Sequence, residues 1–97
     1  MSRPKVFIGT LISKEAESYI GKFCDYDKWE SKENITTDEL AARLGDVEGL
    51  LVPGHIAVNR KVLDNAPKLK IVSNMSVGYN NFDLETMKER NIIGTFL

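Results

Sequence analysis

The 97-residue sequence has few of the residue types that build disulfides and metal sites, and it has no long apolar run. Its one cysteine, Cys24, excludes an intramolecular disulfide and a metal site made of several cysteines. Its one histidine, His55, would need ligands of other types to hold a metal. No uninterrupted apolar stretch approaches the ~20 residues that cross a bilayer. We therefore expect no membrane segment and a location in the reducing cytoplasm.

The sequence also lacks an excess of charge of one sign. There are 13 Lys and Arg against 14 Asp and Glu, which gives a formal net charge of −1 and a pI near 5.8. This balance argues against nucleic acid or an anionic membrane as the main partner. Hydrophobic residues make up 42% and charged residues 28%, which is ordinary for a globular protein. We expect one small domain rather than a two-domain enzyme.

Glycine-rich nucleotide-binding motifs are absent as well. No two of the seven glycines are separated by a single residue, so the dinucleotide fingerprint G-x-G-x-x-G is missing. Gly49 and Gly54 have the spacing of a phosphate-binding loop. His55 and Ile56 follow, however, where that loop requires Lys and then Ser or Thr.

Short apolar runs separated by helical patterns are what the sequence does contain. Runs rich in branched residues predict strands at 6–8, 50–52, 69–72 and 92–97. Alternation at 24–29 predicts an exposed edge strand. Four helices are predicted in the intervals, beginning after Ser13, at the capping box Thr36–Glu39, after Asn59 and near Asp83.

Helical spacing also predicts which side chains are buried and where the helices end. The first helix has an apolar stripe that includes Tyr19 and Phe23. In the second, Arg43 is expected to pair with Glu39, and Gly45 suits a left-handed end. The fourth is expected to bury Leu84 and Met87 and to stop at Asn91.

The order of these elements predicts the fold class. Strand and helix alternate five times, without a last helix to cover the fifth strand. Apolar strands joined by helical crossovers imply a parallel sheet covered on both faces. We therefore predict an α/β, flavodoxin-like doubly wound sheet of five strands in the order 2-1-3-4-5.

In such folds ligands bind outside the carboxyl ends of the strands, so three loops are candidate sites. In residues 9–13, Gly9, Thr10 and Ser13 either cradle an anion or Ser13 simply caps a helix. In residues 53–58, His55 is either a catalytic acid or base or a surface residue of the loop. In residues 74–81, backbone N–H groups around Gly78 either form an anion-binding nest or belong to a structural turn, with Asn81 or Asp83 capping the next helix.

The third loop lies within a recognisable motif. Residues 62–81 read VLDNAPKLKIVSNMSVGYNN. This stretch resembles the D-isomer-specific 2-hydroxyacid dehydrogenases, and within them the glyoxylate/hydroxypyruvate reductases. Residues 4–8 and 89–93 fit the same family.

The resemblance implies a function and its distribution over two domains. The family reduces a 2-oxo acid to a D-2-hydroxy acid by hydride transfer from NAD(P)H, using two Rossmann-like domains. Residues 1–97 then correspond to part of the substrate-binding (catalytic) domain, and the NAD(P)-binding domain is absent. The family's Ser-Val-Gly loop binds the substrate carboxylate through main-chain N–H groups, which assigns Val77 and Gly78 to the small 2-oxo acid, with Ser76 as a weaker neighbour.

The resemblance also implies what this chain lacks. The catalytic Arg, Glu and His of the family lie in the cofactor domain, so we assign no catalytic residue here and expect no activity from this chain alone. We expect NAD(P) to be the cofactor of the parent family and not to bind this chain by itself. Any carboxylate binding by the chain alone is expected to be weak.

Two alternatives of other classes are open. The chain is either a free-standing flavodoxin-like binding module, with residues 9–13 as its site, or a self-associating module. The predicted strand at 92–97 has no covering helix, so exposed apolar surface is expected to favour a homo-oligomer.

Overall fold

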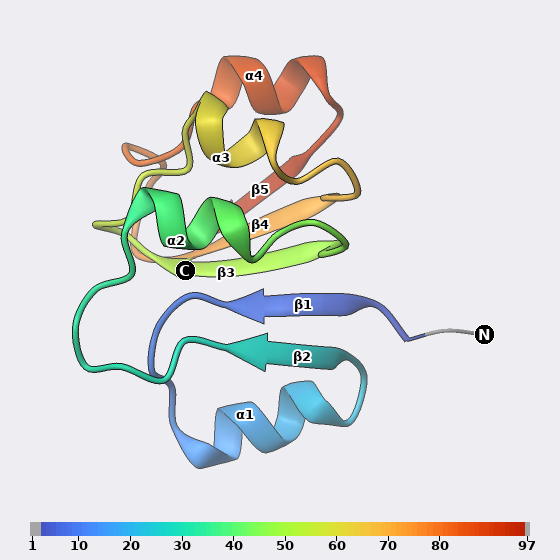
Figure 1. The fold of residues 1–97 in the computed structure, drawn as a ribbon, viewed down its shortest axis with the longest axis vertical. Helices are drawn as coiled ribbons and strands as arrows, with labels where there is room; N and C mark the ends of the chain where they lie inside the picture. Colours follow the sequence, from blue (N-terminus) through green and yellow to red (C-terminus); the bar gives the residue numbers. More distant parts are fainter. Residues whose placement is uncertain (1–2, 97) are drawn as a thin grey trace.

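The computed structural model describes residues 3–96, which form a five-stranded sheet and four helices (Figure 1). The strands are β1 (Lys5–Ile8), β2 (Asp25–Lys28), β3 (Gly49–Pro53), β4 (Ile71–Met75) and β5 (Ile93–Phe96). The helices are α1 (Lys14–Gly21), α2 (Thr37–Ala42), α3 (Arg60–Asp64) and α4 (Leu84–Glu89). No helix among residues 3–96 has the length and hydropathy needed to cross a bilayer.

All neighbouring strands are parallel, and their order is β2-β1-β3-β4-β5. The predicted fold is therefore confirmed, including the edge position of β2. The strand predicted at 69–72 is displaced toward the C-terminus. Leu69 is buried but ends a turn, because its N–H bonds the carbonyl of Ala66, and the ladder begins only at Ile71. Leu97, in the strand predicted at 92–97, lies outside the described residues.

Each helix begins where the sequence places a capping side chain. The side-chain oxygens of Ser13, Thr36, Asn59 and Asp83 accept a hydrogen bond from a backbone N–H of the first turn. The capping box at α2 is complete. Asn91 adopts a left-handed φ of 57° after α4, as predicted.

Two predictions for α2 are wrong. Gly45 is not left-handed, since Gly78 is the only glycine among residues 3–96 with positive φ. Arg43 does not pair with Glu39, whose carboxylate is used in the capping box. Instead Arg43 Nη2 lies 2.6 Å from Asp27 Oδ2 on β2 and stacks over the ring of Phe7. A partner from a neighbouring strand has replaced the local one.

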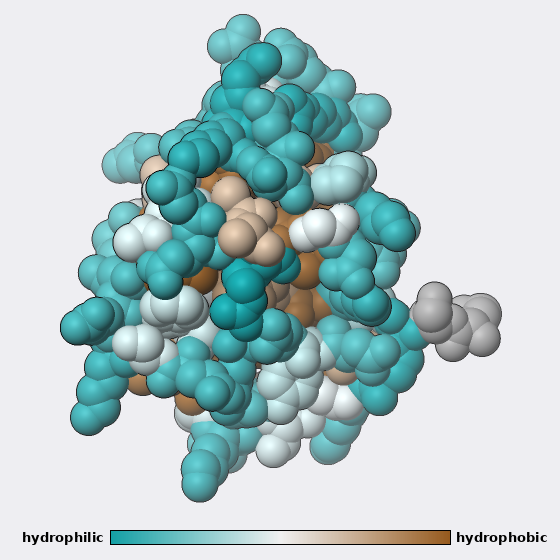
Figure 2. All heavy atoms as spheres, viewed as in Figure 1, coloured by the Kyte–Doolittle hydropathy of each residue, from teal (hydrophilic) through white to brown (hydrophobic). Residues whose placement is uncertain are grey.

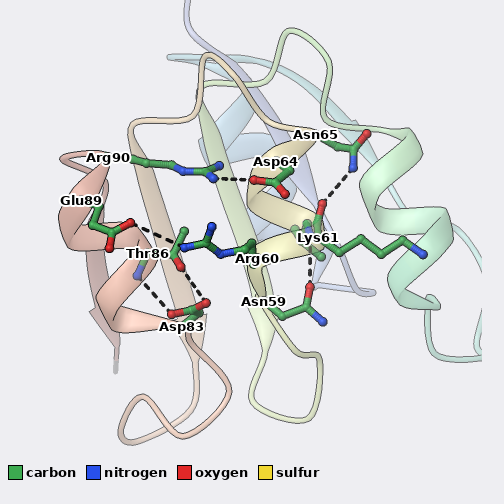
Figure 3. Close-up of polar contacts among 10 residues, drawn as sticks. Asn59, Arg60, Lys61, Asp64, Asn65, Asp83, Thr86, Glu89 and Arg90 are labelled. Atoms are coloured by element: carbon green, nitrogen blue, oxygen red, sulfur yellow. Dashed lines mark hydrogen bonds and ion pairs between the residues drawn. The ribbon is translucent and has the colours of Figure 1, made fainter.

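The helices α2, α3 and α4 cover one face of the sheet (Figure 1). Their buried side chains pack on Phe7, Leu50, Val52 and Val72, which point to this face. Ion pairs Arg60–Glu89 and Arg90–Asp64 link α3 to α4 (Figure 3). Figure 2 shows the outer surface of this layer as mainly hydrophilic, with apolar atoms in its gaps. Leu84 is 50% exposed on this surface, so its predicted burial is wrong, whereas Met87 is buried.

Among residues 3–96 the opposite face carries only α1, so both faces have a helix, but this face is covered only in part, in agreement with the prediction that a last helix is missing. The predicted apolar stripe of α1 is not buried, because Tyr19 and Phe23 are 64% and 60% exposed. Further along this face, Ile71 and Ile93 are paired on neighbouring strands and are 39% and 60% exposed. The core therefore lies on one side of the sheet.

Candidate functional site

The carboxyl ends of the strands meet at one edge of the sheet, on the left in Figure 1. Two of the predicted site loops, after β3 and after β4, contact each other there. A Cβ placed on Gly54 would lie only 2.6 Å from Cβ and Oγ of Ser76. Gly54 therefore allows the two loops to approach closely.

The loop after β4 contains unpaired backbone donors. Among residues 3–96, the N–H groups of Val77, Gly78 and Tyr79 have no hydrogen-bond partner. The Val77 side chain is 85% exposed, and Gly78 has a φ of 99°, a left-handed value that favours glycine. Successive free N–H groups suit an anion such as a carboxylate.

Asp83, and not Asn81, caps the helix that follows this loop. Its Oδ1 accepts from the Thr86 N–H at 3.1 Å, and its Oδ2 accepts from the Thr86 hydroxyl at 2.8 Å (Figure 3). These hydrogen bonds, the backbone one first, lower the pKa of Asp83 below its usual value. The carboxylate thus stays ionised at the N-terminus of α4, which fixes the far end of the loop.

Asn74 and Asn81 hold the loop from inside and were not predicted. Asn74, on β4, is 1% exposed, and its Nδ2 donates to the Gly78 carbonyl at 2.9 Å. The two side chains also bond each other. A signal existed in the sequence, because alternation places Asn74 on the same buried face of β4 as Val72.

Tyr79 anchors the loop to the end of the sheet. Its ring meets Phe96 edge-on at 4.5 Å between centroids and lies 5.6 Å from Phe82. Its hydroxyl donates to the Gly94 carbonyl at 3.3 Å. The side chain of Tyr79 therefore packs against β5 and holds this end of the loop in place.

The other two predicted candidates have ordinary structural roles in this structure. Ser13 caps α1, accepting from the Ala16 N–H at 3.2 Å. His55 is exposed, and its Nε2 lies 2.9 Å from Asn34 Oδ1. Both belong to the carboxyl edge, but neither lies in the loop that carries the free N–H groups.

The residues after β1 do not fit a dinucleotide. The glycine there, Gly9, has its Cβ position 3.2 Å from the Leu51 carbonyl oxygen, and its N–H bonds that oxygen at 2.8 Å. Gly9 thus brings β1 and β3 together instead of leaving room for a pyrophosphate. These residues are therefore given no role in binding a cofactor.

The comparisons with known proteins point to one family. Residues 6–95 match the sequence model of the D-isomer specific 2-hydroxyacid dehydrogenase catalytic domain. Glyoxylate reductases from Pyrococcus furiosus and Thermococcus litoralis are 32% and 33% identical over 93 residues, which is 96% of this chain. The chain spans only 28% of the length of each of these two relatives.

Solved structures agree with the sequence matches. A protein from Pyrococcus horikoshii superposes with a TM-score of 0.90 at 33% identity, over 98% of this chain and 28% of that one. The NADPH-dependent glyoxylate/hydroxypyruvate reductase of Sinorhizobium meliloti, in complex with NADP and malonate, gives a TM-score of 0.75 at 25% identity, over 99% of this chain and 28% of that one. The chain therefore belongs to the D-isomer-specific 2-hydroxyacid dehydrogenase family, with residues 6–95 matching its catalytic domain.

Proposed function

We propose that this chain is the substrate-binding part of a reductase of the glyoxylate/hydroxypyruvate type. In this proposal the backbone N–H groups of Val77 and Gly78 bind the carboxylate of a small 2-oxo acid, and Ser76 lies beside it. The parent reaction is reduction of the 2-oxo acid to a D-2-hydroxy acid. NAD(P)H bound outside residues 1–97 supplies the hydride, and this chain orients the substrate.

The observation that carries the proposal is the set of free N–H groups at Val77, Gly78 and Tyr79. Backbone donors fixed in place bind a carboxylate without a positively charged side chain, and they do not need to reorganise when it arrives. The Sinorhizobium meliloti reductase holds malonate, which is also a carboxylate, and this supports the chemical class of the ligand.

Titration with oxalate, followed by NMR of the backbone amides, tests the site. We expect the Val77 and Gly78 resonances to shift as oxalate is added. Gly78→Ala should abolish the shifts, because Ala at a φ of 99° is strained by about 1–3 kcal/mol and the loop will rearrange. Gly45→Ala is the matched control, since a Cβ at either glycine meets nothing within 4 Å but Gly45 does not have a positive φ. Unmoved amides in the unsubstituted chain would reject the site.

We also propose that the chain alone neither binds NAD(P)H nor reduces 2-oxo acids. Gly9 is used for strand packing, and the family's catalytic Arg, Glu and His have no counterpart in the motif found here. NAD(P)H oxidation with glyoxylate or hydroxypyruvate should therefore equal the rate without protein. Turnover by the pure chain would overturn this part of the proposal.

The free thiol of Cys24 fits a reducing compartment, and we propose the cytoplasm as the site of action. Detection of the native protein in a membrane or secreted fraction of its cell would contradict this proposal.

A further inference from the structure

We propose, resting on the function proposed above, that Asn74 and Asn81 are positioning residues that preset the carboxylate loop. Neither side chain would touch the substrate. Each uses its amide to hold a carbonyl group of a loop at the carboxyl edge, so that the Gly78–Tyr79 peptide has a fixed orientation and the Val77–Tyr79 segment is ordered before any ligand arrives.

The two amides form a closed pair inside the loop. Asn74 Nδ2 lies 2.8 Å from Asn81 Oδ1, and Asn81 Nδ2 lies 3.2 Å from Asn74 Oδ1. The remaining donor capacity goes to loop carbonyls, from Asn74 to Gly78 at 2.9 Å and from Asn81 to Ile56 at 2.9 Å. The pair thus connects the loop after β4 with the loop after β3.

The hydrogen bond from Asn74 to the Gly78 carbonyl fixes the orientation of the Gly78–Tyr79 peptide. The Gly78–Tyr79 peptide is trans, because residues 3–96 contain no cis bond, so its C=O and N–H point in opposite directions. The Gly78 carbonyl points inward to Asn74, and the Tyr79 N–H must then point away from the interior. A flipped peptide would reverse both groups.

Burial makes this orientation costly to change. Asn74 is 1% exposed, so a flipped Gly78 peptide would leave one of its amide hydrogens without a partner and without water. The loop is therefore ordered in advance, and binding of a carboxylate does not bear the cost of ordering it.

The hydrogen bond from Asn81 to the Ile56 carbonyl also holds the loop after β3. Asn81 donates through its side chain to Ile56, and its carbonyl accepts from the Val58 N–H at 2.8 Å. Because Gly54 and Ser76 already touch, this pair of contacts fixes the distance between the two loops. Loss of Asn81 should thus disturb the Ser76–Gly78 segment although Asn81 lies beyond it in sequence.

The experiment uses Asn74→Leu and Asn81→Leu in the 97-residue chain. Leucine is close in size and neutral, so any loss of oxalate affinity does not come from added negative charge. Asn65→Leu is the matched control, because the Asn65 amide donates to the Lys61 carbonyl at an exposed helix end (Figure 3). Asn81 is only partly buried, so its variant serves if Asn74→Leu does not fold.

Two readouts separate positioning from stability. With the fold intact by circular dichroism, the oxalate dissociation constant should rise at least tenfold in both positioning variants and stay unchanged in Asn65→Leu. Without ligand, the ¹⁵N heteronuclear NOE of residues 76–80 should fall in the same two variants, while the NOE of the sheet amides does not.

The outcomes are distinguishable. If the unsubstituted chain shows no oxalate shifts, the proposed function fails, and the role of the asparagine pair in binding fails with it. If the unsubstituted chain binds oxalate and the folded variants bind it equally well, the proposed function stands and the positioning role alone is overturned. Reduced stability with unchanged affinity would also overturn it.

Discussion

At the scale of single residues, the contact between Gly54 and Ser76 controls how the two site loops fit together. The space between them does not accommodate one further carbon, since a Cβ on Gly54 would lie 2.6 Å from Cβ and Oγ of Ser76. The residue after Gly54 is His55, whose Nε2 lies 2.9 Å from Asn34 Oδ1, so the loop after β3 is held from its other side as well. A substitution at Gly54 should therefore displace the proposed carboxylate loop.

We expect Gly54→Ala to destabilise the chain by about 1–3 kcal/mol and to weaken oxalate binding. Ser76→Gly in the same chain should restore most of the binding, because it removes both atoms that the new methyl group meets. Urea unfolding and the NMR titration measure the two effects. Equal affinities for the single and double variants would contradict the role of this contact, with Gly45→Ala as the control.

At the scale of elements, α1 differs from the other helices in what holds it. None of its residues is buried, whereas α2, α3 and α4 each bury two. Its attachment is polar: Glu17 Oε1 lies 2.8 Å from Lys28 Nζ and 2.8 Å from the Tyr26 hydroxyl, both on β2. These partners, Lys28 first, lower the pKa of Glu17.

The lowered pKa of Glu17 predicts a pH dependence for α1. Because the pKa of Glu17 is lowered in the folded state, its ionised carboxylate stabilises the attached helix at pH values above the ordinary pKa of 4.5. This stabilisation is lost as the pH falls through the folded-state pKa. Hydrogen exchange of the α1 amides, corrected for intrinsic rates, should therefore become faster relative to α2 between pH 6 and pH 3.

Glu17→Gln tests the cause of that dependence. The variant should show fast exchange in α1 at both pH values, because glutamine has no charge to lose. Glu15→Gln, at an exposed position of the same helix, should behave like the unsubstituted chain. An unchanged pH profile in Glu17→Gln would show that another group is responsible.

At the scale of the whole molecule, the sheet is unequally covered. Three helices pack on one face, while the other face leaves Ile71, Met75 and Ile93 exposed by 39%, 38% and 60%. Exposed branched side chains on adjacent strands are a surface on which protein chains associate. We propose that a second copy of this chain covers them, which gives the homo-oligomer expected from the sequence.

Sedimentation velocity over a range of concentrations tests the proposed association. The unsubstituted chain should show a concentration-dependent increase in sedimentation coefficient, and Ile93→Lys should abolish it by placing a charge on the uncovered face. Leu84→Lys is the control, because Leu84 is 50% exposed on the opposite, helix-covered side. A monomer at all concentrations, or equal association of both variants, would reject this surface.

The sequence by itself determined the features that depend on near neighbours. Caps at Ser13, Thr36 and Asn59 act within three residues, and the left-handed Asn91 follows from its position after a helix. Strand–helix alternation was enough to predict a parallel sheet and its strand order, since right-handed crossovers allow few arrangements of the strands. The motif around Gly78 likewise indicated the family.

Only the tertiary structure decided the features that depend on residues distant in sequence. It gave Arg43 the partner Asp27 in place of Glu39, and it left Tyr19 and Phe23 of the predicted apolar stripe 64% and 60% exposed. It also brought Asn74 to Asn81 and Gly54 to Ser76. Periodicity reports which side of an element is apolar, but the identity of the neighbour on that side is set by how several elements pack together.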